Sequence, residues 1–406
     1  MDQSMISGLL AQYPTPLYVF EEKELKERIK YLRAHLPEGV RLCFAVKANP
    51  FVGGFLTDLV ERFEICSPGE MYICEKQGIP AGQFVLSGVY KDEPSMRYAF
   101  EHGLCEGILT AESVRQFELL ASLAKEYRKP VRLLLRLTSG SQFGMDGEDV
   151  LSLLKRCRDE LSVSTRDGSG PEPLLTFAGI QFFSGTQKTS LKKHRREFAL
   201  IDDFIDRIRE ETGLNVPELE YGPGLPAAYF AGETLDLDAW LSEFSALLCG
   251  MRNRLPVTLE LGRGIAAPCG SFLTRVVDLK RNNGEGYAIV DGGIHHLTYY
   301  GQFMAMKHPL CEIWPPREQG EDDPEWTLCG ALCTTNDLLV KKLPVHDLKT
   351  GDVVIFHNTG AYCMTEGISL FLSRDLPAVV WLKENGEAQL LRDAQSVWGL
   401  NGGVRA

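Results

Sequence analysis

Residues 41–50 read RLCFAVKANP, an apolar run that ends in Lys47 and is followed by turn-forming residues. A short apolar run bounded by turn formers is typical of a buried strand, which places Lys47 at the end of the predicted strand. An amine there can lose its proton through desolvation and form a Schiff base with a carbonyl compound. The same pattern also fits an ordinary strand-end lysine that reaches water, so the surrounding sequence has to decide.

Seven further apolar runs follow along the chain, and most are separated by segments with helical periodicity, such as AESVRQFELLASLAKEYRK. The eight runs are residues 41–46, 63–66, 83–86, 107–110, 131–137, 177–183, 218–221 and 256–261. Eight repeated strand-helix units predict an α/β fold, specifically a (β/α)₈ barrel.

The active site of such a barrel lies at the carboxyl ends of its strands, so reactive residues should stand there. The residues at or just after the ends of the predicted strands are Lys47, Ser67, Arg136, Thr186, Gly222, Gly224, Glu260 and Arg263. The fold often binds a phosphate with the loops after strands seven and eight, where YGPGLP and ELGRG lie. Glycines let backbone amides approach an anion, and an arginine adds charge. We therefore expect one shared pocket.

The pattern changes beyond about residue 268, where short β-like runs such as SFLTRVVDLKR and DVVIFHN alternate with turns. We predict a barrel over residues 21–267, an all-β domain over 268–406, and an N-terminal strand within 1–20 that packs with the β domain. The polar segment TRDGSGPEP, residues 165–173, is predicted to be a surface loop within the barrel.

Composition limits the partners of the 406-residue chain, which is 44% hydrophobic and has a formal net charge of −12. An acidic chain without a basic stripe argues against nucleic acid or an anionic membrane as a partner. The sequence has neither a secretory leader nor a membrane-length apolar run, so we expect a cytoplasmic protein. Its eleven cysteines show no zinc-site spacing, which predicts reduced thiols and no metal.

Ten short fragments, taken together, resemble one family. In order they are TPLYVF, FAVKANP, FEICSPGE, SQFGM, FFSGTQ, YGPGLP, ELGRG, DGG, CGALCTTND and GAY. The resemblance is to the pyridoxal-phosphate decarboxylases with an alanine-racemase-like barrel, which include diaminopimelate, ornithine and arginine decarboxylases, and it runs nearly end to end. It implies a decarboxylase that uses pyridoxal 5′-phosphate.

The resemblance also implies roles for the strand-end residues. Lys47 would carry the cofactor as a Schiff base, and Glu260 would face the pyridine nitrogen and keep it protonated, so that the ring accepts electrons. Gly222, Gly224 and Arg263 would hold the phosphate. The other residues that we expect to contact the cofactor are Ser67, Arg136, Phe183, Thr186 and Tyr362.

Cys333, in CGALC, corresponds to the cysteine that protonates the carbanion in this family. A thiol near a cationic cofactor can donate a proton, although a buried core cysteine would show the same pattern. In the family this cysteine and the GAY segment with Tyr362 reach the cofactor of the partner subunit. The resemblance therefore implies a homodimer with shared active sites.

Two departures from the family leave the substrate open. Phe183 stands where the family has a histidine that stacks on the cofactor, so stacking is possible without a hydrogen bond, although another register would bring Gln181 or Ser184 close. Thr334 follows Cys333 where diaminopimelate and ornithine decarboxylases have an acidic residue for the distal amine of their substrates.

The segment after Asp291 lacks the arginine that diaminopimelate decarboxylases use for the distal carboxylate. The chain thus resembles a side branch that acts on conjugated amino acids or on amino acids joined to a carrier protein. We expect the substrate near Thr334, Asp337, His295 and His296, although the two histidines also fit ordinary loop structure.

Two other functions fit the same fold. An amino-acid racemase would have an arginine at the pyridine nitrogen, whereas this chain has Glu260. A carrier that binds pyridoxal phosphate without catalysis would lack the β domain with Cys333 and GAY. Both observations favour the decarboxylase.

Overall fold

The computed structural model describes residues 1–161, 174–318, 320 and 322–403. The chain divides into two compact units. The barrel unit comprises Ile29–Pro226 and Asp236–Gly264, and the sheet unit comprises Met1–Arg28, Ala227–Leu235 and Ile265–Ala406. The predicted range of the barrel, 21–267, thus includes a stretch around residue 230 that belongs to the sheet unit. The loop predicted at 165–173 lies outside the described residues.

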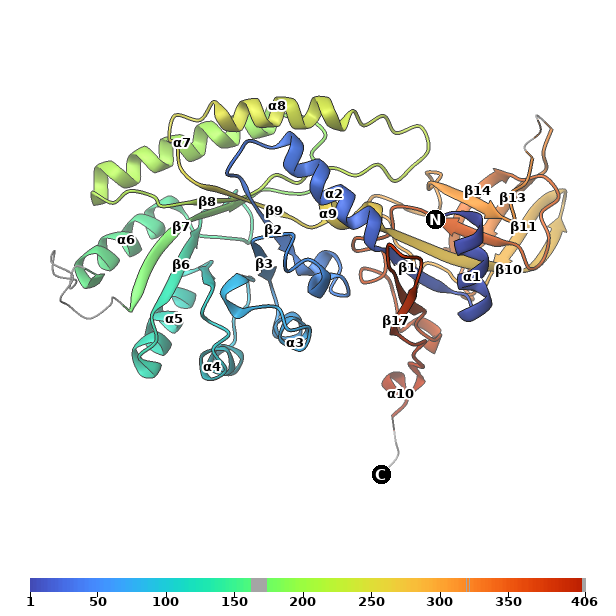
Figure 1. Cartoon of the computed structure of the whole chain (residues 1–406), viewed down its shortest axis with the longest axis horizontal. Coiled ribbons are helices and arrows are strands. Elements are labelled where there is room, and N and C mark those ends of the chain that lie inside the picture. The colour runs from blue at the N-terminus through green and yellow to red at the C-terminus, as the bar shows by residue number, and fades with distance from the viewer. Residues whose placement is uncertain (162–173, 319, 321, 404–406) are drawn as a thin grey trace. The chain divides into compact units, whose positions relative to one another are not determined.

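The barrel is closed by eight parallel strands, and each predicted apolar run forms one of them (Figure 1). The strands are β2 (Arg41–Ala45), β3 (Arg62–Ile65), β4 (Phe84–Leu86), β5 (Ile108–Ala111), β6 (Val131–Arg136), β7 (Leu175–Phe183), β8 (Leu219–Gly222) and β9 (Val257–Leu261). The first and last strands pair in register, with Cys43 opposite Glu260. The predicted (β/α)₈ barrel is confirmed.

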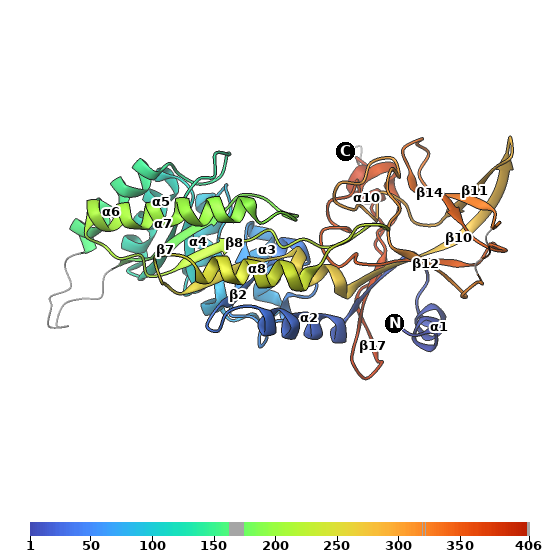
Figure 2. The ribbon, with the colours of Figure 1, turned by 90° about the horizontal axis from the view of Figure 1, so that it is seen from above.

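Helices lie between most of the strands of the barrel, and Figures 1 and 2 show α7 and α8 running side by side. The connecting helices are α3 (Pro68–Lys76), α4 (Glu93–Glu101), α5 (Val114–Tyr127), α6 (Gly147–Leu161), α7 (Lys192–Thr212) and α8 (Leu237–Cys249). The helix α2 (Glu22–His35) precedes β2, and the short α9 (Arg263–Ala266) follows β9. Polar residues begin several of them: Ser67 accepts a hydrogen bond from the amide of Glu70, and Ser113 and Asp236 cap α5 and α8 in the same way. These caps fix the point where each strand-end loop becomes a helix.

The barrel encloses both apolar and ionisable side chains. Cys43, Val85, Ile108, Leu134 and Ala178 form one buried cluster, as expected for inward-facing positions of a filled barrel. Buried ionisable side chains come from β3, β8 and β9, and they are Arg62, Glu64, Glu220 and Glu260. Burial and the charges of these three glutamates raise the pKa of the Cys43 thiol, so the two sets of side chains are neighbours.

The sheet unit is built around nine strands, with β1 in the order β14-β13-β11-β10-β1-β16-β17 and with β15 pairing β10 and β12. The strands are β1 (Leu17–Glu21), β10 (Gly270–Asn282), β11 (Glu285–Val290), β12 (Cys311–Trp314), β13 (Glu325–Cys329), β14 (Leu338–Pro344), β15 (Val353–Phe356), β16 (Ala378–Leu382) and β17 (Ala388–Arg392). The N-terminal strand β1 pairs antiparallel with β10 and parallel with β16.

Two helices, α1 (Gln3–Gln12) and α10 (Trp398–Asn401), accompany the sheet. Ile6 and Leu9 of α1 are buried against Leu17, Val19 and other apolar residues of the sheet. The sequence analysis predicted a strand within residues 1–20 and did not predict the helix α1. Within the described residues, no helix is long and apolar enough to cross a membrane.

Candidate active site

Lys47 lies in a single 3-10 turn, Val46–Ala48, directly after β2. Its Nζ donates a hydrogen bond to Oε2 of Glu64, lies 3.4 Å from Sγ of Cys66 and is 3.7 Å from Oε1 of Glu260. The lysine side chain is 39% exposed, whereas the side chains of Glu64 and Glu260 are 2% and 7% exposed. An accessible amine therefore sits above two buried carboxyl groups.

The two carboxyl groups near Lys47 differ in acidity. Burial alone would raise the pKa of Glu64, but the Lys47 charge and hydrogen bonds from Cys66 and Lys47 bring it below its ordinary value. Burial and the negative charge of Glu64 raise the pKa of Glu260 to about 7, with Lys47 and Arg136 acting in the opposite direction. Glu64 is thus the anion that pairs with Lys47, and Glu260 can gain or lose a proton near neutral pH.

Neighbouring side chains hold the two acids in place. The amide Nε2 of the fully buried Gln181 donates to Oε2 of Glu260 at 2.9 Å, and Sγ of Cys66 donates to Oε1 of Glu64 at 2.9 Å. Burial and the Glu64 charge raise the pKa of Cys66, which keeps it a thiol that can donate this bond. Arg136, at the end of β6, bonds Oε1 of Glu112 at 3.0 Å and is 6% exposed.

A second group of predicted residues surrounds the start of the loop after β8. A Cβ atom on Gly222 would overlap the ring of Phe183, and one on Gly224 would overlap the carbonyl oxygen of Gly185. Gly224 also has a positive φ of 65°, which other residues adopt with strain. Only glycine therefore fits at both positions without displacing its neighbours, and the backbone there carries no side chain that would block an anion.

Arg263 and Thr186 adjoin these glycines in the barrel unit. Nε of Arg263 lies 3.4 Å from Oγ1 of Thr186, and Arg263 is 5% exposed. The loop itself is braced from behind, because the ring of the buried His194 bonds the carbonyl oxygen of Pro223 at 2.7 Å. The backbone amides of this loop, the Thr186 hydroxyl and the Arg263 guanidinium together form a set of hydrogen-bond donors that suits a phosphate group. These residues and the Lys47–Glu260 pair fit pyridoxal phosphate.

Some functional residues were missed by the sequence analysis. Glu64 and Cys66 stand in FEICSPGE, where the analysis selected Ser67, but Ser67 acts as the N-cap of α3. An acidic residue inside an otherwise apolar strand was the available signal, because such a residue rarely faces a core without a cation. Gln181 was named only as a neighbour, and it is the hydrogen-bond partner of Glu260.

Another buried ionic group lies deeper in the barrel. Glu218 accepts hydrogen bonds from Arg62, including one of 2.9 Å, and pairs with Arg41 at 2.7 Å. Glu220 is fully buried, and neither of its carboxyl oxygens has a hydrogen-bond partner among the described residues. Nη1 of Arg62 is 3.6 Å from Oε2 of Glu220. Burial and the Glu260 charge raise the pKa of Glu220 to about 8, so this group is neutral at pH 7.

The remaining predicted residues lie in the sheet unit. Cys333 is exposed, and Thr334 accepts a weak hydrogen bond of 3.4 Å from the amide of Asn336. Tyr362 is half-buried and has a positive φ of 66°. Within the described parts of the chain, no group of three or more His, Cys, Asp and Glu side chains is arranged to hold a metal ion.

Three of the predicted substrate residues are buried in the sheet unit. The Asp337 carboxylate is 2% exposed and accepts hydrogen bonds from the amides of Ile294 at 2.8 Å and Leu332 at 2.7 Å. His295 and His296 are 1% and 2% exposed, and burial lowers their pKa values to about 3 and about 4. Contact of these three residues with a substrate stays a prediction.

An eight-stranded barrel whose strand ends present an amine, two carboxyl groups, two glycines and an arginine fits an enzyme of the pyridoxal-phosphate class. A family model described as pyridoxal-dependent decarboxylase, C-terminal sheet domain, matches residues 17–360. The chain belongs to this family of pyridoxal-phosphate-dependent amino-acid decarboxylases.

Relatives with known activities are similar along nearly the whole chain. L-Glutamyl-[BtrI acyl-carrier protein] decarboxylase of Niallia circulans is 27% identical over 97% of this chain and 94% of its own. Diaminopimelate decarboxylase of Zymomonas mobilis is also 27% identical, over 96% and 92%. The crystal structure of diaminopimelate decarboxylase from Helicobacter pylori with L-lysine has a TM-score of 0.79 at 20% identity and covers 98% of this chain and 99% of its own.

Proposed function

We propose that this decarboxylase acts on an α-amino acid whose distal end carries no charge, namely a conjugated amino acid or one tethered to a carrier protein. The observation that carries the proposal is the neutral Thr334 directly after Cys333. A threonine hydroxyl cannot neutralise a distal ammonium. The segment of residues 292–309 contains no arginine to pair with a distal carboxylate, although it contains Lys307.

The named activities of two relatives support a conjugated substrate. One is the Niallia circulans enzyme, whose name specifies a glutamyl group on an acyl-carrier protein. The other is 2-[(L-alanin-3-ylcarbamoyl)methyl]-2-hydroxybutanedioate decarboxylase of Staphylococcus aureus, which is 23% identical over 95% of this chain and 98% of its own. Since diaminopimelate decarboxylases match equally well in identity, the side chains near Cys333 carry the argument for the substrate.

The barrel residues have the following proposed roles. Lys47 would hold the aldehyde carbon of pyridoxal phosphate, and the amides of Gly222 and Gly224 would hold its phosphate together with Arg263. Glu260 would hold a proton for the pyridine nitrogen. The bound cofactor supplies an electron sink for the pair released when the bond to the carboxylate breaks. When the Lys47 amine is free, Glu64 forms an ion pair with it and keeps the lysine near its reactive position.

Cys333 donates the proton that replaces the departing carbon dioxide, and Tyr362 contacts the cofactor. Two copies of the chain then build each site. Exposed apolar side chains in the sheet unit, including Phe303, Met306 and Trp398, at 66%, 75% and 71% exposed, support association of two copies. We propose that a homodimer is the active form.

Matched substrate pairs test the substrate proposal. Carbon dioxide release and product mass are measured for free amino acids and for the same amino acids blocked at the distal end by an amide or by attachment to a carrier protein. We expect the blocked form to be preferred in kcat/KM. Preference for free diaminopimelate or free ornithine would contradict the proposal, and inversion at Cα without gas release would indicate a racemase.

Subunit mixing tests the shared site. Lys47→Ala and Cys333→Ala variants are each expected to be inactive as homodimers. If Lys47 and Cys333 of one site come from different copies, a heterodimer of the two variants contains one intact site, and an equal mixture recovers about one quarter of wild-type activity. No recovery after verified subunit exchange would refute a site shared between copies.

A further inference from the structure

A buried carboxylate of α7 joins the segments that carry the proposed phosphate site. Glu197 is 6% exposed, and its two oxygens accept hydrogen bonds from three other side chains. The donors are Oγ of Ser184, the hydroxyl of Tyr221, and Nζ of Lys188, which lies 3.0 Å and 3.3 Å from the two oxygens. Ser184 and Lys188 belong to the loop after β7, whereas Tyr221 belongs to β8, the strand that pairs with β7. One side chain of a helix therefore ties together two neighbouring strand ends of the barrel.

The network contains a buried ion pair. Lys188 is 8% exposed and pairs with Glu197. Burial raises the pKa of Glu197, but hydrogen bonds from Ser184 and Tyr221 and the Lys188 charge bring it below its ordinary value. Glu197 is thus an anion at neutral pH. Removal of its charge would leave the buried Lys188 ammonium without this counter-ion, which is costly.

The backbone of Lys188 connects the network with the loop after β8. Its amide donates a hydrogen bond to the carbonyl oxygen of Gly224 at 2.9 Å, and its carbonyl oxygen accepts one from Nε1 of Trp240 at 2.9 Å. A Cβ atom on Gly224 would lie 2.3 Å from the carbonyl oxygen of Gly185 and 3.1 Å from Cα of Thr186. The loops after β7 and β8 therefore pack directly on each other, and the position of Lys188 sets their spacing.

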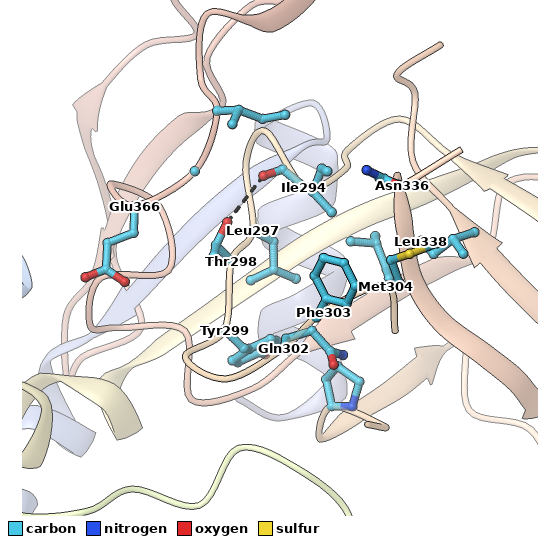
Figure 3. Close-up of a pocket in the computed structure, with 14 residues that line it drawn as sticks. Ile294, Leu297, Thr298, Tyr299, Gln302, Phe303, Met304, Asn336, Leu338 and Glu366 are labelled. Carbon is cyan, nitrogen blue, oxygen red and sulfur yellow. Dashed lines mark hydrogen bonds between the residues drawn. The ribbon is translucent and has the colours of Figure 1, made fainter. Parts of the chain in front are cut away.

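These two loops carry residues that we propose to hold the cofactor phosphate, and a pocket in the sheet unit is not suited to it. That pocket, of about 260 Å³, is lined by Phe303, Met304 and Leu338 among others (Figure 3). Among the described residues that line it there is no lysine, arginine or histidine, and Glu366 is acidic. A phosphate would find no cation there and would be repelled by Glu366. This pocket therefore offers no alternative to the phosphate site in the barrel.

We infer that Glu197 is a positioning residue of the phosphate site, an inference that rests on the site proposed for the loops after β7 and β8. Its carboxylate holds Ser184 and Lys188, and Lys188 in turn holds Gly224. Thr186 and Gly224 are thereby kept at the spacing that a phosphate group needs. Glu197 acts through these neighbours and does not bind the phosphate, since two anions would repel each other. The cofactor affinity of the enzyme thus depends on a side chain that does not contact the cofactor.

The test compares pyridoxal phosphate with pyridoxal, which has the same aldehyde and ring but no phosphate. The full chain is freed of cofactor, and its affinity for each compound is measured by spectrophotometric titration. Glu197→Gln should weaken binding of pyridoxal phosphate at least about tenfold, because three hydrogen bonds to a charged group are disrupted. Binding of pyridoxal should change less than about twofold, since Lys47 and Glu260 remain in place. A loss confined to the phosphorylated compound is the expected result.

Asp202→Asn is the matched control. Asp202 is a second buried acid of α7, 5% exposed, and it accepts hydrogen bonds from the amides of Arg252 and Asn253, each at 2.9 Å. These amides precede β9, at the end of the barrel opposite to the phosphate loops. Asp202→Asn should lower the free energy of unfolding, as chemical denaturation would show, and leave both affinities unchanged.

Ser184→Ala is the variant to use if Glu197→Gln does not fold. It removes one of the three donors and leaves the buried ion pair intact. We expect pyridoxal phosphate to bind about threefold more weakly, with binding of pyridoxal unaffected. Unchanged binding of both compounds would overturn the inference.

Arg263→Ala distinguishes failure of this inference from failure of the proposed phosphate site. If Arg263→Ala weakens binding of pyridoxal phosphate and Glu197→Gln does not, the phosphate site holds and the positioning role is refuted. If neither variant weakens it, the phosphate binds elsewhere and both proposals fail. Equal losses for the two compounds in Glu197→Gln would show a general disturbance of the barrel and would also refute the role.

Discussion

Replacement of Glu220 by glutamine should stabilise the barrel at neutral pH, because the native carboxyl group is buried and protonated. Glu220 is fully buried, and its oxygens lack hydrogen-bond partners among the residues that the structure describes. Arg62 lies 3.6 Å away but already bonds Glu218 with two nitrogens. The charges of Glu260, Glu218 and Glu64 oppose ionisation of Glu220, and only Arg62 favours it.

The magnitude follows from the difference between the folded and unfolded pKa of Glu220. The folded pKa is about 8 and the ordinary value is 4.5. Between these values the native state keeps a proton that the unfolded state has lost, so the free energy of unfolding falls as pH rises, by about 1.4 kcal/mol per pH unit. From pH 4.5 to pH 7 the loss is about 3 kcal/mol, and it ends above pH 8. Glutamine does not titrate, so the free energy of unfolding of the Glu220→Gln variant does not fall in this pH range.

The assay is chemical denaturation of the apoprotein, followed by far-ultraviolet circular dichroism at several pH values. We expect the variant to gain about 3 kcal/mol relative to wild type between pH 4.5 and pH 7. Glu218→Gln is the matched control. Burial raises the pKa of Glu218, but Arg62 and other groups lower it below its ordinary value, so loss of the Glu218 charge should destabilise the barrel at neutral pH. A difference between wild type and Glu220→Gln that is independent of pH, or a destabilised variant at pH 7, would show that Glu220 is ionised against Arg62 and would refute the reasoning.

Three further predictions concern the site. Gly224→Ala should weaken cofactor affinity at least about tenfold, because backbone strain and overlap with Gly185 displace the loop. Gly213→Ala is the control, since Gly213 also has a positive φ but no atom lies close to its added Cβ, so this variant should lose only stability. Spectrophotometric titration with pyridoxal phosphate measures the affinity of both variants. Glu64→Gln should move the alkaline limb of the pH–rate profile to lower pH, because the Glu64 charge helps to raise the pKa of Glu260, which must keep its proton; an unchanged limb contradicts this coupling. Cys333→Ala should lower kcat at least about a hundredfold, the usual contribution of a positioned proton donor, with borohydride-fixed cofactor unchanged; full activity would exclude Cys333 as the donor.

Much of the barrel could be predicted because its signals are local in the sequence. A buried parallel strand is a continuous apolar run, and eight such runs separated by helical periodicity leave few alternatives. Lys47, Glu260 and the glycines after β8 stood out because each ends such a run. The N-terminal strand β1 was also recognisable as a short β-rich run.

The contacts between the strand ends could not be predicted from the same signals. Glu64 lies on β3, Cys66 directly follows β3 and Gln181 lies on β7, and only closure of the barrel brings them to Lys47 and Glu260. Asp337 shows the same limit, because only the fold brings the amides of Ile294 and Leu332 within hydrogen-bond distance of its carboxylate.

The sequence by itself determined the barrel, the family and the cofactor, because strand periodicity and strand-end residues are encoded over a few adjacent positions. The tertiary structure decided which acid pairs with the Lys47 ammonium, which acid stays neutral in the core and which histidines are removed from solvent. These properties depend on burial and on charges less than 4 Å apart, and residues that are distant in sequence supply both.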